Sequence, residues 1–172
     1  MEFQNIITFE INIKKSYLFC DLYFDGMKEV GLINRFVSKV VSEQGHQDQL
    51  MVVDAGFAIP LGVETIDISL RENVPTVCEV LSELRKFFSV EKMILAKQTK
   101  EVNPSLFCKI SEIWGEDTVV EVVDHSELKR ISKSVKAVIR TGDFTAYGNV
   151  ILVSGAGARW YCENKVTTNS EL

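Results

Sequence analysis

From Met27 onward, apolar residues recur in two alternating patterns along the chain. In some stretches they return every three or four positions, which predicts a helix with one buried face. In others they form short runs or alternate strictly with polar residues, which predicts a strand. Six strands are predicted, at 49–53, 64–69, 92–96, 118–123, 137–140 and 149–153.

Four helices are predicted, one before the first strand and three between later strands. The first is capped at its C-terminus by Gly45, and the second opens at Pro75. The third begins with the N-cap pair Asn103-Pro104 and ends at Gly115, and the fourth runs over 126–135. The buried faces of the first three are predicted to hold Phe36, Val37, Val40, Val41; Val77, Val80, Leu81, Leu84, Phe88; and Leu106, Phe107, Ile110, Ile113.

The alternation of strands with helices predicts an α/β fold, namely a three-layer α/β/α sandwich with a largely parallel sheet in a single domain. We place this domain at residues 27–160. Residues 1–26 mix apolar and polar positions without a helical period, and residues 161–172 are polar and are predicted to form a tail. We interpret residues 1–26 as an upstream extension, and as an alternative they form an added strand or a partner-binding arm.

Composition and charge argue against several classes of protein. The chain has 172 residues, 46% of them apolar, and a net charge of -5 with its basic residues scattered, which argues against a nucleic-acid surface. Its four cysteines lack the spacing of a zinc site or a disulfide framework, so we expect reduced thiols. No apolar run approaches the ~20 residues of a membrane span. The first 26 residues also lack the features of a signal peptide. We therefore expect a cytoplasmic protein.

Two histidines and one aspartate are candidates for chemistry. His46 and His125 are the only histidines, and histidine is the side chain that titrates near neutral pH. Asp54 and His125 each follow a predicted strand, and ligands bind outside the carboxyl ends of parallel strands, so both should lie at one edge of the sheet. His125 also precedes a helix start, whose dipole favours a neutral imidazole. The alternatives are that both histidines are structural and that Asp54 bonds the N–H groups of its own turn.

A polar loop at 141–149 adds Tyr147 and Asn149, which either bind hydroxyl groups or close a turn. The chain has no phosphate-binding loop, no Gly-x-Ser-x-Gly nucleophile motif and no pair of closely spaced histidines, so a catalytic metal is not expected.

Several of these segments, in this order, resemble the D-ribose pyranase family. The resemblance extends over about residues 27–155. The segments that carry it are Gly45-His46-Gln47-Asp48, Asp54-Ala55-Gly56-Phe57-Ala58-Ile59-Pro60, Ile66-Asp67-Ile68-Ser69-Leu70, Val74-Pro75, His125, Val138-Ile139-Arg140-Thr141-Gly142 and Tyr147-Gly148-Asn149.

The resemblance implies an isomerase that interconverts β-D-ribopyranose and β-D-ribofuranose and so supplies ribokinase with the furanose. It implies no metal and no organic cofactor, and a ring-shaped homo-oligomer, typically a decamer, with active sites at subunit contacts. By correspondence, His46 is the proton donor. The sugar-binding positions are Asp54, His125, Tyr147, Gly148 and Asn149, and Lys129 is a weaker candidate contributed by a neighbouring subunit.

Two alternatives remain open. The first is a mutarotase for L-fucose or another sugar. The related L-fucose mutarotases can carry Tyr-Gly-Asn, as here at Tyr147-Gly148-Asn149, but they usually have arginine where His125 stands. The other alternative is a non-catalytic sugar-binding accessory of ribose uptake, which would need Asp54 and Asn149 but not His46.

Overall fold

The computed structural model describes residues 28–115 and 118–157. The chain divides into two units, Met1–Val30 and Gly31–Leu172, and the fold described here lies in the second. The proposed extension at 1–26 and the tail at 161–172 fall outside the described residues.

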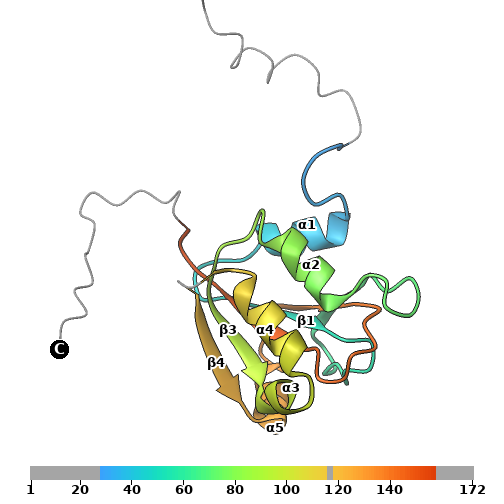
Figure 1. The fold of residues 1–172 in the computed structure, drawn as a ribbon. Helices are drawn as coiled ribbons and strands as arrows, with labels where there is room; N and C mark the ends of the chain where they lie inside the picture. Colours follow the sequence, from blue (N-terminus) through green and yellow to red (C-terminus); the bar gives the residue numbers. More distant parts are fainter. Residues whose placement is uncertain (1–27, 116–117, 158–172) are drawn as a thin grey trace, which may run out of the picture. The chain divides into compact units, whose positions relative to one another are not determined.

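A six-stranded sheet forms the middle layer (Figure 1). Its order is β2 (Glu64–Asp67), β5 (Ala137–Arg140), β1 (Gln49–Val53), β6 (Val150–Ser154), β3 (Val90–Ala96) and β4 (Val119–Val123). Neighbouring strands run parallel except at β6, which is antiparallel to both β1 and β3. The prediction of a largely parallel sheet is confirmed.

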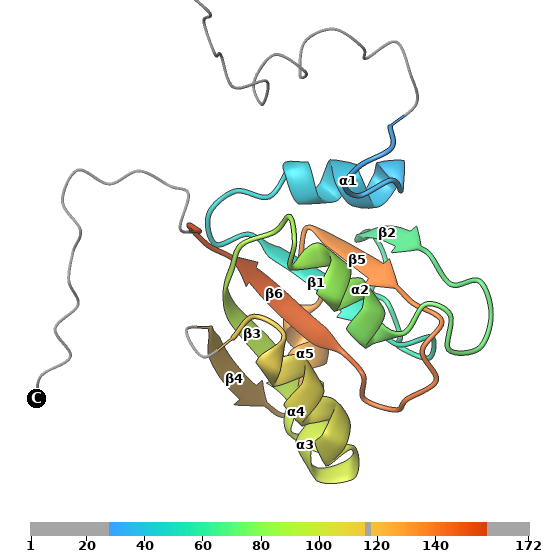
Figure 2. The same ribbon diagram turned by 45° about the horizontal axis from the view of Figure 1, so that its top comes forward.

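Helices cover both faces of the sheet, which confirms the three-layer sandwich (Figure 2). One face packs against α1 (Arg35–Ser42), α2 (Val77–Leu84) and α4 (Pro104–Glu112), through buried residues such as Val40, Leu81 and Ile110. The other face packs against α5 (His125–Ile131) through Leu128. Alternate residues of β1 enter the two cores, Leu50 and Val52 on one side and Met51 and Val53 on the other. This is the period-two geometry of a strand buried on both faces.

Several predicted helix boundaries were wrong. α1 ends at Ser42 with Glu43 as its C-cap, because Gly45 instead donates its N–H to the Asp48 carboxylate in the turn before β1. Phe36, in the first turn of α1, stays 57% exposed, so the buried face is narrower than predicted. α2 begins after Thr76, whose hydroxyl forms a capping box with Glu79, so Pro75 precedes the helix rather than opening it.

The region around α3 and α5 also differs from the prediction. α5 starts at His125 itself and ends at Ile131, four residues before the predicted end. α3 (Lys97–Val102) was missed, because its mainly polar sequence carries no apolar stripe. Asn103 is the N-cap of α4, but its side chain makes no capping bond.

Cys78 and Cys108 are free thiols, while Cys20 and Cys162 lie outside the described residues. Within residues 28–115 and 118–157, no helix combines the length and the apolar character that a membrane span requires.

Candidate functional site

Asp54 and Asn149 form a buried pair where β1 ends and β6 begins. The Asn149 amide Nδ2 donates to Asp54 Oδ2 at 2.8 Å, and Asn149 Oδ1 accepts from the Asp54 backbone N–H at 3.1 Å. The antiparallel pairing of β1 with β6 brings these two positions together. The pair holds a carboxylate and an amide in fixed orientation at the edge of the sheet.

Asp54 also bonds within its own turn, which was the alternative interpretation of this residue. Its Oδ1 accepts the Gly56 N–H at 2.9 Å, as a turn residue would. Each carboxylate oxygen can accept a second hydrogen bond beyond those already made. The turn role and a ligand-binding role are therefore compatible in one side chain.

His125 lies at the same edge, as the carboxyl-end rule predicted. Its ring meets the Tyr147 ring edge to face, with centroids 5.1 Å apart, and the Phe57 ring at 6.2 Å. Nδ1 of His125 is buried and has no hydrogen-bond partner in the described part of the chain. A protonated imidazole must donate from both nitrogens, so this surrounding favours the neutral ring.

Burial and the positive charge of Lys129 act on the pKa of His125 in the same direction. Burial lowers the pKa of His125 from its ordinary value, and the nearby Lys129 ammonium lowers it further, while the Asp54 carboxylate opposes both. Burial is the largest of these causes, and the helix dipole expected to favour a neutral His125 stays a prediction. Lys129 is exposed and lies one turn along α5 in the same chain.

Tyr147 and Gly148 complete this edge. Tyr147 has a φ of 61°, in the left-handed region that residues with side chains rarely adopt. Residues 145–148 do form a turn, as the alternative interpretation of this loop had it, because the Gly148 N–H donates to the Thr145 carbonyl. Gly148 is packed so closely that a Cβ there would lie 3.0 Å from that carbonyl oxygen and 3.7 Å from Asp54 Cβ. The backbone at 147–149 therefore runs directly against Asp54.

Two residues that support the site were not singled out as site residues from the sequence. Arg140, at the end of β5, donates from Nε and Nη2 to the Ala55 carbonyl and pairs with Asp67 through Nη1. Asp143 is buried and accepts from the Val77 and Thr145 N–H groups, while its carbonyl accepts from Ala55 N. Arg140 ends a strand parallel to β1, so the rule that located Asp54 would also have located Arg140.

A hollow of about 380 Å³ adjoins Asp54 and is walled in part by Arg140, Asp143 and Phe144. Phe144 is 65% exposed at its rim. His125 and Tyr147 do not line this hollow, and both side chains are half-buried beside Asp54.

His46 is not brought to this edge. It precedes β1, and its neighbour Gln47 donates its N–H to Ser154 at the far end of β6. Its Nδ1 lies 3.9 Å from Glu91 Oε2 near the start of β3. At about 3.3 Å per residue, the stretch from Asp48 to Asp54 separates the two ends of the sheet by roughly 20 Å. Within one chain, His46 and Asp54 therefore occupy opposite edges of the sheet.

The structure holds no group of three or more His, Cys, Asp and Glu side chains suited to a metal ion within the described residues. We call the end of the sheet that carries Asp54, Asn149, His125 and Tyr147 the Asp54 edge. The groups available there are a carboxylate, an amide, a neutral imidazole and a phenol. Such groups bind and exchange protons with hydroxyl groups.

Comparison with known proteins assigns the chain to a family. Residues 27–157 match the model of the RbsD / FucU transport protein family. The D-ribose pyranase of Kosmotoga olearia is 43% identical over 130 residues, which cover 75% of this chain and 98% of that protein. The D-ribose pyranase of Streptococcus agalactiae is 40% identical over 129 residues, with the same coverage of both chains.

Solved structures agree with this assignment. RbsD of Bacillus subtilis, solved in complex with D-ribose, is 35% identical, with a TM-score of 0.73 over 76% of this chain and 98% of that one. The fucose mutarotase of Streptococcus pneumoniae, solved with L-fucose, shares the fold at 16% identity, with a TM-score of 0.58 over 73% of this chain and 94% of that one. The chain belongs to the RbsD / FucU transport protein family.

Proposed function

We propose that this protein is a D-ribose pyranase, an isomerase that interconverts β-D-ribopyranose and β-D-ribofuranose. One observation carries the proposal: the Asp54–Asn149 pair lies beside His125 and Tyr147 at one sheet edge, in a chain 35% identical to a protein solved with D-ribose. Relatives named D-ribose pyranase, at 43% identity over 98% of their length, support the same activity.

The reaction requires only proton transfers between oxygen atoms. To open a hemiacetal ring, one proton is delivered to the ring oxygen and one is removed from the anomeric hydroxyl. Closure to the other ring size repeats these transfers at a different hydroxyl. No C–H bond breaks, so the scheme uses no metal and no organic cofactor. General acid–base catalysis of this kind contributes about 10²–10⁴-fold.

The groups at the Asp54 edge suit the binding of the sugar. The remaining lone pairs of the Asp54 carboxylate accept hydrogen bonds from hydroxyl groups, and a neutral His125 both donates and accepts. Because Asp54 is 7% exposed and fixed by Asn149, its orientation is set before the sugar arrives. A prearranged site avoids the entropy cost of ordering these side chains on binding.

The proton donor assigned to His46 then comes from a second copy of the chain. His46 and Asp54 lie at opposite ends of β1, so one copy does not bring both to the same sugar. The His46 side chain is 63% exposed, beside a hollow of about 470 Å³ that includes Phe87, Phe88 and Gly155 in its wall. We infer that this end of one copy meets the Asp54 edge of its neighbour.

This arrangement favours self-association into a ring. A contact between two different surfaces of identical chains is head to tail, and it closes into a ring when the rotation between copies allows. We propose a homodecamer that works in the cytoplasm, where ribokinase uses the furanose. Analytical ultracentrifugation of the full chain measures the number of copies.

Exchange spectroscopy by NMR tests the activity. Magnetisation transfer between the pyranose and furanose signals of ribose is measured with and without the protein. We expect faster exchange with it, and a non-catalytic sugar binder would leave the exchange rate unchanged. The same measurement with L-fucose distinguishes a fucose mutarotase, which would accelerate exchange of fucose more than of ribose.

A further inference from the structure

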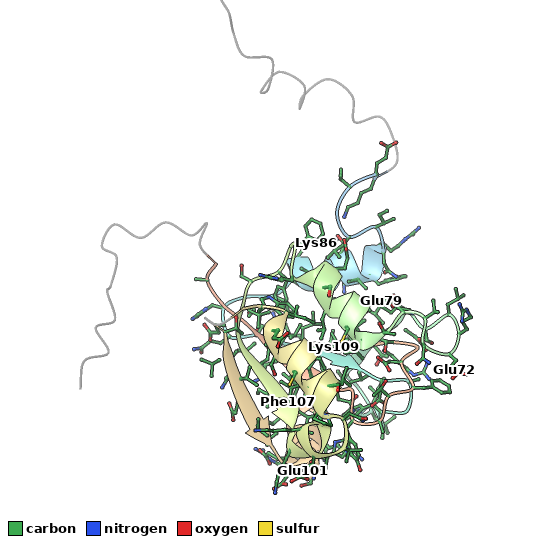
Figure 3. The ribbon with its side chains drawn as sticks, viewed as in Figure 1. Glu72, Glu79, Lys86, Glu101, Phe107 and Lys109 are labelled. Carbon is green, nitrogen blue, oxygen red and sulfur yellow. The ribbon has the colours of Figure 1, made fainter. Side chains whose placement is uncertain are left out.

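The short helix α3 and its following residue reach three points of the Asp54 edge. Gln98 Oε1 accepts the His125 backbone N–H at 3.0 Å, and Thr99 Oγ1 donates to the Tyr147 carbonyl at 2.7 Å. The side-chain amide of Asn103, which makes no capping bond to α4, donates to the Ala146 carbonyl at 2.6 Å. In Figure 3, Glu101 marks α3 and Phe107 marks the adjoining α4. One polar helix therefore bonds both segments that carry the rings of the site.

Thr99 is the most deeply buried of these three residues. It is fully buried, and its hydroxyl bonds to a backbone carbonyl 48 positions away in the chain. Buried hydroxyl groups are almost always hydrogen-bonded, since an unpaired one costs free energy. A threonine in the first turn of an exposed helix would need no such partner, so this contact belongs to the tertiary structure around Tyr147.

Thr99 bonds to Tyr147, whose backbone conformation is unfavourable for a residue with a side chain. Tyr147 sits at a φ of 61°, a conformation that persists only where its surroundings enforce it. The enforcing contacts are the Thr99 bond to its carbonyl and the turn bond from Gly148 N to the Thr145 carbonyl. The ring of Tyr147 then meets the ring of His125 edge to face.

We propose that Thr99 is a positioning residue for sugar binding, which holds Tyr147 in its left-handed conformation and thereby fixes its ring against His125. This inference rests on the proposed function, because Tyr147 is there a sugar-binding position. Thr99 does not touch the sugar, since its side chain is enclosed. Its effect passes through Tyr147.

The test compares Thr99→Val, Thr99→Ser and Thr65→Val with the parent in the full chain. Valine has the shape of threonine without the hydroxyl, and serine keeps the hydroxyl. Thr65 is an exposed threonine on β2 whose hydroxyl bonds only locally, so Thr65→Val is the matched control. KM and kcat for ribose come from exchange spectroscopy at increasing ribose concentration, and assembly size is checked for each variant.

We expect Thr99→Val to raise KM about five- to tenfold, the value of one lost hydrogen bond, with kcat changed less than KM. Thr99→Ser and Thr65→Val should keep the parent's KM. In the Tyr147→Ala background, Thr99→Val should have no further effect on KM, since a residue that acts through Tyr147 has nothing left to position. If Thr99→Val does not assemble, Thr99→Ser against Thr99→Ala isolates the same hydroxyl.

An unchanged KM in Thr99→Val, or an equal rise in the Tyr147→Ala background, overturns the proposal. A rise of KM in Thr99→Ser as large as in Thr99→Val overturns it too, because the hydroxyl is then not the cause. These failures are distinct from failure of the proposed function. In that case the parent chain itself would not accelerate ribose exchange.

Discussion

Asn149 and Asp54 bond each other twice, once through the side chains and once from the Asp54 backbone N–H to the Asn149 amide oxygen. The two residues are 95 positions apart in the chain, and both are more than nine-tenths buried. The Asp54 carboxylate accepts from Asn149 Nδ2 at one oxygen and from the Gly56 N–H at the other, so it keeps one orientation. The pair therefore serves the fold and the proposed site together.

Asp54→Asn should weaken ribose binding as well as turnover. The new amide puts a donor or a weaker acceptor where the carboxylate accepted hydroxyl groups, so we expect affinity to fall about tenfold to a hundredfold. The measurement is a ribose titration followed by NMR. Asp124→Asn removes a charge next to His125 from a side chain that makes no capping bond, and it should leave affinity unchanged. Equal affinity in Asp54→Asn and the parent would remove Asp54 from the site.

Asn149→Ala should cost stability in addition to affinity. It leaves the Asp54 N–H and one carboxylate oxygen without their partner in a buried place, which lowers the free energy of unfolding by about 1–3 kcal/mol. Denaturant unfolding of the variant and the parent measures the difference. A variant as stable as the parent, with the same ribose titration, would show that the pair is dispensable.

The sequence predicted one half of this edge well. Asp54 and His125 each follow a strand, and the carboxyl ends of parallel strands meet, so their shared location was predictable and is confirmed. The place of Asn149 was not, because apolar spacing does not reveal strand direction. Only the antiparallel entry of β6 puts Asn149 opposite Asp54.

The role of α3 and the position of His46 relative to Asp54 could not be predicted from the sequence, for different reasons. The role of α3 depends on tertiary contacts of Thr99 and Gln98, and its mainly polar sequence gave no periodic signal. His46 was grouped with Asp54 by resemblance, while the strand between them places the two at opposite edges. The resemblance implied active sites at subunit contacts, and the fold adds that His46 and Asp54 of one chain lie at opposite ends of β1.

The titration of His125 should have its midpoint below 6.5, its ordinary pKa, because burial and Lys129 lower the pKa. Between that lower value and 6.5 the unfolded chain binds a proton that the folded chain does not, so stability should fall as the pH is lowered through this window. Lys129→Met should move the midpoint upward, whereas Lys133→Met is the control. The imidazole signals are followed by NMR, with His125→Asn identifying the resonance. A midpoint at or above 6.5 contradicts the prediction.

Residues 27–172 expressed alone should behave like the full chain. The family model begins at residue 27, and the related pyranases are covered over 98% of their length by 75% of this chain. We therefore expect the same melting temperature, assembly size and ribose exchange for both proteins. Aggregation or loss of exchange in the shorter protein would favour the alternative, an added strand or a partner-binding arm.

His46→Ala should abolish most of the acceleration of ribose exchange while folding and assembly persist, because His46 is exposed and its truncation removes little packing. Asp54→Asn should also accelerate exchange far less than the parent at ribose concentrations below its raised KM. If each site takes His46 from one copy and Asp54 from another, chains of the two variants co-expressed in one assembly rebuild intact sites. Random mixing of equal amounts makes about a quarter of the contacts intact, so about a quarter of the parent's exchange rate should return. A site contained in one chain predicts no recovery, because every copy then carries one of the two changes. Recovery that appears in mixed assemblies, and not when the separately purified variants are combined without subunit exchange, would place His46 and Asp54 on opposite sides of a subunit contact.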